Sequence, residues 1–174
     1  MIVTSVVRTL DVSAASGLVL REGSFHVVAD DENDLYVFGP DGATRRIALL
    51  PGDLPGKKAQ RKKHKADFEI LVDLPDHGLL AMGSGSRATR ERGVLVDHRD
   101  RTTIIDTSSL CATLRETFAD LNLEGAALVG DEFVLLQRGN RSDRRTALVF
   151  IAMHDLQRAL VSKQFAVTRA PRIV

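Results

Sequence analysis

The sequence of 174 residues predicts an all-β protein, a β-propeller of four-stranded antiparallel blades with about three blades in this chain. Three segments repeat: "SGLVLREGSFHVVAD" from Ser16, "EILVDLPDHGLLAMG" from Glu69 and "EGAALVGDEFVLLQR" from Glu124. Each holds two apolar runs of strand length around a tight polar turn, the pattern of a β-hairpin. Repetition roughly every fifty residues is typical of propeller blades. A β-sandwich is the alternative, because its turns are also regularly spaced.

The remaining strands follow each repeated segment along the chain. A polar loop leads to a third apolar run, and a weaker fourth strand completes each unit. The third runs lie at 35–38, 93–97 and 147–152, and the fourth strands are expected at 44–50, 102–106 and 164–169. We therefore predict a single, incomplete propeller-type domain over residues 1–174, with blade-like repeats anchored at Ser16, Glu69 and Glu124.

One or two short helices are expected in the connecting loops. Residues 108–118 place apolar side chains on one helical face, with Ser108 or Ser109 at the N-cap. Residues 154–162 are a weaker candidate. Cys111 lies beside the apolar face of the first helix, and we interpret it as a small core residue rather than a nucleophile.

The composition is that of an ordinary globular domain, with 44% hydrophobic and 27% charged residues. The net charge is +1 and 5% of residues are aromatic, with no Trp, so binding to nucleic acid is not expected. A single cysteine cannot form an internal disulfide, which fits a reducing compartment. No membrane span or signal peptide is visible, so we expect a cytoplasmic protein of bacterial type that does not contact membranes.

Blade topology predicts one polar face. The first strand of a blade lies nearest the axis, and its start should meet the loop that joins the second and third strands. Carboxylates at these positions are candidate ligands for a hard cation such as Ca²⁺, and cationic or hydroxyl side chains are candidate ligands for an anion. The tentative metal ligands are Asp30, Asp31, Glu69 and Glu124. The candidate ligand-binding residues are Lys65, Ser84, Ser86, Arg87, Arg138 and Asn140.

The repeated glutamates allow two interpretations. Glu69 and Glu124 can accept hydrogen bonds from backbone N–H groups of the following loop and so lock each blade. Alternatively, they hold a metal ion near the axis. The basic segment "KKAQRKKHK" (57–65) is interpreted as a solvated loop, with capture of a phosphate-rich ligand or an acidic protein partner as the alternative.

The segment "GSGSRATRER" (83–92) has the glycine spacing of a dinucleotide-binding loop, in Gly83, Gly85 and Ala88. A Rossmann loop must open a helix, and only a few residues separate Ala88 from the next strand. The segment is therefore predicted to join two strands of the middle unit, with its serines and Arg87 exposed as donors.

At "KADFEILVDLPDHGLLAMGSGSR" and "LNLEGAALVGDEFVLLQRGNR" the sequence resembles a bacterial family of β-propellers of unknown function, and more distantly the esterase-like-phytase propellers. The matching motifs are Lys65-x-Asp67-x-Glu69, Gly83 to Ser86 followed by Arg87, Asn122 to Gly125, and Gln137 to Asn140. The resemblance covers most of residues 14–150 and implies a propeller with further blades after the third. The chain would then be part of a larger ring, or pair with a second copy that covers its open edge.

Two functions are compatible with these residues. The first is a binding or scaffold propeller whose polar face takes an anionic small molecule or a partner peptide. The alternative, implied by the phytase-like resemblance, is a Ca²⁺-dependent phosphoesterase at the same face, in which the metal polarises a phosphoryl oxygen and activates water. No catalytic residue is assigned in either case.

Overall fold

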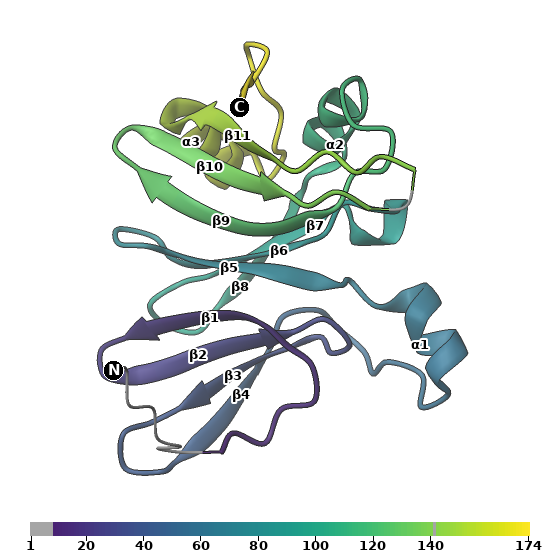
Figure 1. Cartoon of the computed structure of the whole chain (residues 1–174). Coiled ribbons are helices and arrows are strands. Elements are labelled where there is room, and N and C mark those ends of the chain that lie inside the picture. Colours follow the sequence, from purple (N-terminus) through teal and green to yellow (C-terminus); the bar gives the residue numbers. More distant parts are fainter. Residues whose placement is uncertain (1–8, 141) are drawn as a thin grey trace, which may run out of the picture.

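The computed structural model describes residues 9–140 and 142–174, which form three four-stranded antiparallel sheets (Figure 1). Residues 1–8, on which the expected lack of a signal peptide partly depends, lie outside the described residues. The first sheet contains β1 (Ala15–Arg21), β2 (Ser24–Ala29), β3 (Asp34–Phe38) and β4 (Thr44–Ala48). The second contains β5 (Phe68–Leu74), β6 (Gly78–Gly83), β7 (Arg92–Val96) and β8 (Thr102–Asp106). The third contains β9 (Leu123–Val129), β10 (Glu132–Gln137), β11 (Ala147–Ala152) and β12 (Arg172–Ile173).

In each sheet, strands adjacent in sequence are also adjacent in space, as predicted. The chain forms three sheets, whereas the alternative β-sandwich would have two. The turns have the expected chemistry. Glu22 and Gly23 join β1 to β2 with positive φ angles of 50° and 74°, which suit a two-residue hairpin. Gly78 has a φ of 118°, and a Cβ there would lie 2.1 Å from the Val96 carbonyl oxygen, so only glycine fits this turn.

Each first strand contains a β-bulge, and in all three the extra residue is the anchor of the sequence repeat. In β1 the register shifts between Ala15 and Gly17, which leaves Ser16 as the extra residue. The corresponding shifts leave Glu69 extra in β5 and Glu124 extra in β9. A bulge bends the strand and redirects a side chain. The anchors of the repeat are therefore the bulge residues, whose side chains leave the regular alternation of β1, β5 and β9.

The sheets are stacked with the second between the other two, and β5 contacts both β1 and β9 (Figure 1). One apolar cluster joins the first and second sheets, with Val28, Leu35 and Leu79 among its members. A larger cluster joins the second and third sheets to two helices and includes Phe133 and Phe165. Burial of these apolar faces is the main force that holds the sheets together.

The described residues contain three α-helices, one more than the upper limit we expected: α1 (Lys58–His64), α2 (Ser108–Arg115) and α3 (Met153–Ser162). The predictions of α2 and α3 are confirmed. The N-cap prediction for α2 is wrong, because Thr107 occupies that position and Asp106 Oδ1 accepts the hydrogen bond from the Ser108 N–H at 2.8 Å.

The loop expected over residues 57–65 is instead the helix α1, which buries none of its residues. Its lysine, alanine, glutamine and arginine residues have high helix propensity, and its last turn is basic, which complements the helix dipole. The helix α1 is therefore formed by local preference and remains solvated.

The fourth strand of the third sheet was expected at 164–169 and lies at β12 instead. The expected segment contains Phe165, which is buried against Phe133 with ring centroids 6.0 Å apart. The Phe165 N–H donates to the Asp106 carbonyl at 2.7 Å, and its own carbonyl accepts from Leu110. Contacts with the second sheet and α2 therefore remove this segment from the third sheet.

Among the residues that the structure describes, every helix is too short or too polar to cross a membrane.

Candidate functional site

A buried carboxylate lies at the entrance to β5. Asp67 has a left-handed backbone (φ 57°) and is 5% exposed. Its Oδ1 atom is 2.7 Å from Lys65 Nζ. Its Oδ2 atom accepts hydrogen bonds from Arg90 Nη1 and Ser84 Oγ, each at 2.7 Å. Lys65 Nζ also lies 2.7 Å from Asp30 Oδ2, so one ammonium group joins the first and second sheets.

The two anchoring glutamates are held differently. Glu124 Oε1 accepts a hydrogen bond from Asn122 Nδ2 at 2.6 Å and lies 2.9 Å from Arg138 Nη2. Within residues 9–140 and 142–174, Glu69 has no hydrogen-bond partner, and neither glutamate accepts a backbone N–H group. The blade-locking hydrogen bonds that the sequence suggested for these carboxylates are therefore not formed.

The carboxyl group of Glu69 has a raised pKa. Burial raises the pKa of Glu69 to about 7, and the carboxylates of Glu124, Asp67 and Asp30 add to the rise, while the Lys65 ammonium opposes it. Near neutral pH this carboxyl group is therefore present in both protonation states. It can donate a hydrogen bond when protonated and only accept when ionised.

A glutamine performs the locking role that was expected of the glutamates. Gln137 is fully buried, and its Oε1 accepts the Asn122 N–H at 2.8 Å. Its Nε2 donates to the carbonyl oxygens of Asp120 at 3.2 Å and Arg138 at 3.1 Å. These hydrogen bonds hold the segment before β9 against the end of β10.

A polar pocket of about 250 Å³ lies where the second and third sheets meet, at the starts of β5 and β9. It is lined by Lys62, Asp67, Glu69, Ser86, Arg87, Arg90, Arg115, Ala119, Asp120, Leu121, Asn122, Glu124, Arg138 and Asn140. Most side chains predicted for the polar face thus come together here.

Three further predicted residues lie next to the polar pocket: Lys65 and Ser84 contact Asp67, and Asp30 pairs with Lys65. Ser84 is buried and also hydrogen-bonds to Ser86 with the two Oγ atoms 2.9 Å apart, so it supports the pocket wall rather than facing a ligand. Asp31 lies apart, where Ser13 Oγ donates to it at 2.7 Å and Arg61 Nη1 is 3.8 Å away.

The cations of the polar pocket divide into two groups. Arg90, Arg115 and Arg138 each pair with a carboxylate. Arg87 and Lys62 are exposed and have no ion pair in the described part of the chain. The pocket therefore presents two cations whose charge is not neutralised by the protein.

Sequence reasoning missed the residues that organise this pocket. Arg90 contacts both Asp67 and Ser86 Oγ, at 2.7 and 2.8 Å, and was not proposed. Asn122 and Arg115 were also not proposed. Asp67 was noted only within the Lys65-x-Asp67-x-Glu69 motif, where its position between two proposed residues was the available signal.

The acidic cluster beside the polar pocket fits Ca²⁺ poorly. Carboxylate oxygens of Asp30, Asp67 and Glu69 lie within 4.8 Å of one another. However, Lys65 Nζ lies between Asp30 and Asp67, and Arg90 occupies the second oxygen of Asp67. Ca²⁺ requires six to eight oxygen ligands, so a site here would first have to displace the lysine. The contacts therefore disfavour calcium.

The fold and the site together define a class: a mostly β protein of three four-stranded sheets with a charged pocket at the junction of two of them. The chain belongs to the family of unknown function DUF6929, whose model matches residues 11–173. A search of curated proteins found no match. The predicted membership of a domain-of-unknown-function family is confirmed, and the likeness to esterase-like-phytase propellers stays a prediction.

Proposed function

We propose that this protein is a propeller-type binding module whose polar pocket takes a small anionic molecule. The observation that carries the proposal is the presence of two unpaired cations, Arg87 and Lys62, in a pocket where the other arginines are already paired. A negatively charged group between them gains charge-assisted hydrogen bonds without breaking an existing ion pair. Ser86 and Asn140 supply neutral polar groups nearby.

The helix α1 supports this proposal because it concentrates positive charge beside the pocket. Lys62, on α1, lines the polar pocket itself, and Lys58 and Lys63 on the same helix are exposed cations. A positive surface next to a pocket raises the local concentration of anions and accelerates their association. The effect weakens as salt rises, because exposed charges are screened.

The test is a calorimetric titration with inorganic phosphate, and with sulfate for comparison, at low ionic strength. We expect saturable binding by the wild-type protein and about tenfold weaker binding after Arg87→Ala, since hydrogen bonds to charged groups contribute about 1.5–3 kcal/mol. Arg99→Ala is the matched control. Arg99 is also exposed and lies in the turn between β7 and β8, and its side chain forms no hydrogen bond or ion pair among the described residues.

Equal losses in the Arg87→Ala and Arg99→Ala variants would mean that only the overall charge attracts the anion. Absence of saturable binding would refute the anionic ligand. A partner peptide with acidic residues is the larger ligand compatible with the same cations, and competition between phosphate and such a peptide would place both in the polar pocket.

The Ca²⁺-dependent phosphoesterase is the second candidate, favoured by the short distances among the Asp30, Asp67 and Glu69 oxygens. A thermal-shift series with Ca²⁺, Mg²⁺ and EDTA separates it from the binding module, because a ligand of the native state raises the unfolding midpoint. We expect no shift, since Lys65 already pairs with Asp30 and Asp67 and Arg90 pairs with Asp67. A rise with Ca²⁺ that EDTA reverses would favour the enzyme.

We further propose that the three sheets are propeller blades and that the outer sheets pack against further blades, in a homo-oligomer or a larger ring. In support, the first sheet exposes Leu18 and Leu20, at 60% and 63%, and the third exposes Val129 and Leu148, at 54% and 42%. Apolar faces of this kind mark interaction surfaces. Light scattering tests the oligomer, and a strictly monomeric species would exclude it for this chain.

A further inference from the structure

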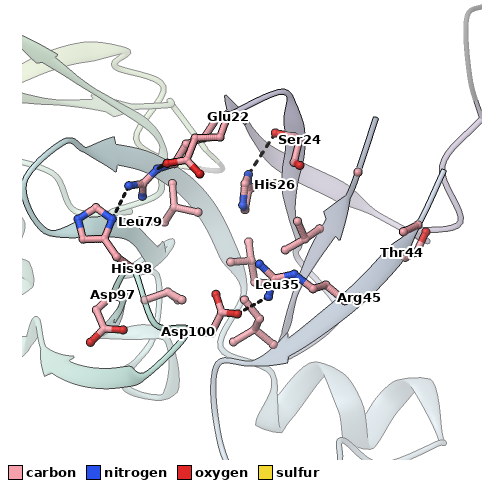
Figure 2. A pocket seen from close by; sticks show the side chains of 16 residues that line it. Glu22, Ser24, His26, Leu35, Thr44, Arg45, Leu79, Asp97, His98 and Asp100 are labelled. Carbon is pink, nitrogen blue, oxygen red and sulfur yellow. Dashed lines mark hydrogen bonds and ion pairs between the residues drawn. The ribbon is translucent and has the colours of Figure 1, made fainter. Parts of the chain in front are cut away.

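A second pocket, of about 300 Å³, opens between the first and second sheets at the end of the molecule opposite the starts of β1 and β5 (Figure 2). The turns between β1 and β2, β3 and β4, and β7 and β8 form its rim. Its floor is apolar and comes from both sheets, with Leu35 and Ile47 from the first and Leu79 and Val96 from the second. We call it the His26 pocket. The rim is polar and charged, and only the floor is apolar. An apolar surface combined with positioned polar groups can orient a small molecule.

The central polar group of this pocket is His26, which is 9% exposed (Figure 2). Its Nδ1 atom lies 3.2 Å from the Ser24 carbonyl oxygen, so Nδ1 carries the proton and donates. Burial lowers the pKa of His26, which keeps the ring neutral near pH 7. The Nε2 atom then holds a lone pair that points away from Ser24, and no described residue hydrogen-bonds to it.

The charged groups at the rim already neutralise one another. Arg45 pairs with Asp100, and Arg21 contacts the His98 Nδ1 atom at 2.6 Å and lies 3.6 Å from Asp73. An anionic ligand would have to compete with these partners, in contrast to the unpaired cations of the polar pocket. In the His26 pocket, the group that lacks a partner among the described residues is the acceptor His26 Nε2, which lies over an apolar surface.

We propose that the His26 pocket is a second binding site, for a small neutral molecule with an apolar, ring-sized body and one O–H or N–H group that donates to His26 Nε2. A volume of about 300 Å³ lies at the lower end of the range for small-molecule sites, so the pocket has room for a body of one ring. This site is independent of the anion proposed for the polar pocket, because the two pockets share no residue.

The test compares three probes of similar size by NMR of the histidine ring resonances: phenol, toluene and benzoate. Phenol and toluene differ only in the group that can donate, and benzoate adds a negative charge. We expect saturable shifts of the His26 resonances with phenol, binding of toluene weaker by about fivefold, as loss of one hydrogen bond predicts, and weaker binding still for benzoate. The His26→Phe variant, followed by the ring resonances of His98 at the rim, should lose the preference for phenol over toluene.

His77→Phe is the matched control, since His77 is exposed in the β5–β6 turn and should leave the preference intact. A wild-type crystal soaked with 4-bromophenol locates the probe directly, even if His26→Phe fails to fold. Equal affinity for phenol and toluene, tightest binding of benzoate, or bromine located outside the His26 pocket would each overturn the proposal.

Discussion

The polar pocket and the His26 pocket lie between neighbouring sheets of the same kind, yet their chemistry differs. The junction of the second and third sheets receives two bulged glutamates, Glu69 and Glu124, which bring further charges with them. At the same bulge position the first sheet has Ser16, whose hydroxyl donates to the Phe68 carbonyl at 2.5 Å and is thereby used within the fold. The bulge residue therefore decides whether the start of a first strand carries a carboxylate or a hydroxyl, whereas the His26 pocket lies at the opposite end of these strands.

The two junctions also differ in how deeply their ion pairs are buried. In the Asp67–Arg90 pair the side chains are 7% and 10% exposed. In the Arg45–Asp100 pair of the His26 pocket they are 53% and 49% exposed. A buried carboxylate that loses its charge leaves cations without a partner, whereas an exposed pair is replaced by water. The same substitution should therefore have very different costs at the two sites.

The largest effect is expected for Asp67→Asn. Removing this charge leaves Lys65 and Arg90 in a buried site with reduced compensation, and we expect a loss of about 3–5 kcal/mol in the free energy of unfolding. Asparagine tolerates the left-handed backbone at this position, so the substitution reports on charge. Urea denaturation followed by circular dichroism measures the loss.

Asp100→Asn is the matched control, because Asp100 also has a positive φ, of 60°, and also pairs with an arginine. Its pair is exposed, so the expected cost is at most about 1 kcal/mol. Equal costs for the two variants would show that burial does not distinguish the junctions.

The repeat allowed most of the fold to be predicted from the sequence, because hairpin turns and strand-length apolar runs are local signals. The anchors Ser16, Glu69 and Glu124 were found as a repeat, and the structure adds the reason, a bulge at each. Segment 164–169 could not be placed, since Phe165 is apolar enough for a strand and only its backbone hydrogen bonds with Asp106 and Leu110 decide otherwise. A tertiary contact of this kind leaves no periodic trace in the sequence.

The site was predicted in part for the same reason. Topology alone brought Glu69, Glu124, Arg87 and Arg138 to one pocket, because the glutamates lie at the starts of first strands and the arginines lie in the loops that follow second strands. Arg90 was missed because it occurs once and its direction depends on the short 3₁₀ turn after Arg87, η1 (Ala88–Arg90). The direction of a side chain inside a loop follows from packing, and a sequence repeat does not specify that packing.

The pH dependence of stability sharpens the comparison further. Glu69 has a pKa of about 7 in the folded protein, above its ordinary value of 4.5, so between these values the folded state holds a proton that the unfolded state releases. Stability contributed by this group is therefore full below pH 4.5 and is lost as pH rises through 7. Glu69→Gln should stabilise the protein at pH 8 by about 1–2 kcal/mol, after allowance for solvent screening, and not at pH 4.

Urea midpoints across this pH range measure the effect of Glu69→Gln. Asp73→Asn, on the same strand β5 but outside the polar pocket, serves as the control. A Glu69→Gln variant that follows the wild-type curve at every pH would mean that Glu69 ionises normally.

The smallest effect is expected at His26, and its sign is opposite. Burial lowers the pKa of His26 and nearby Arg45 and Arg21 lower it further, while the hydrogen bond to the Ser24 carbonyl and the charge of Asp100 raise it. The unfolded state therefore takes up the proton first, and stability falls as pH drops below the ordinary value of 6.5. His26→Gln should flatten this part of the urea-midpoint curve, while leaving the loss near pH 7 that belongs to Glu69. Because the opposing contributions at His26 partly cancel, this effect is expected to be the smallest, and an acid loss that His26→Gln leaves unchanged would show that His26 does not cause it.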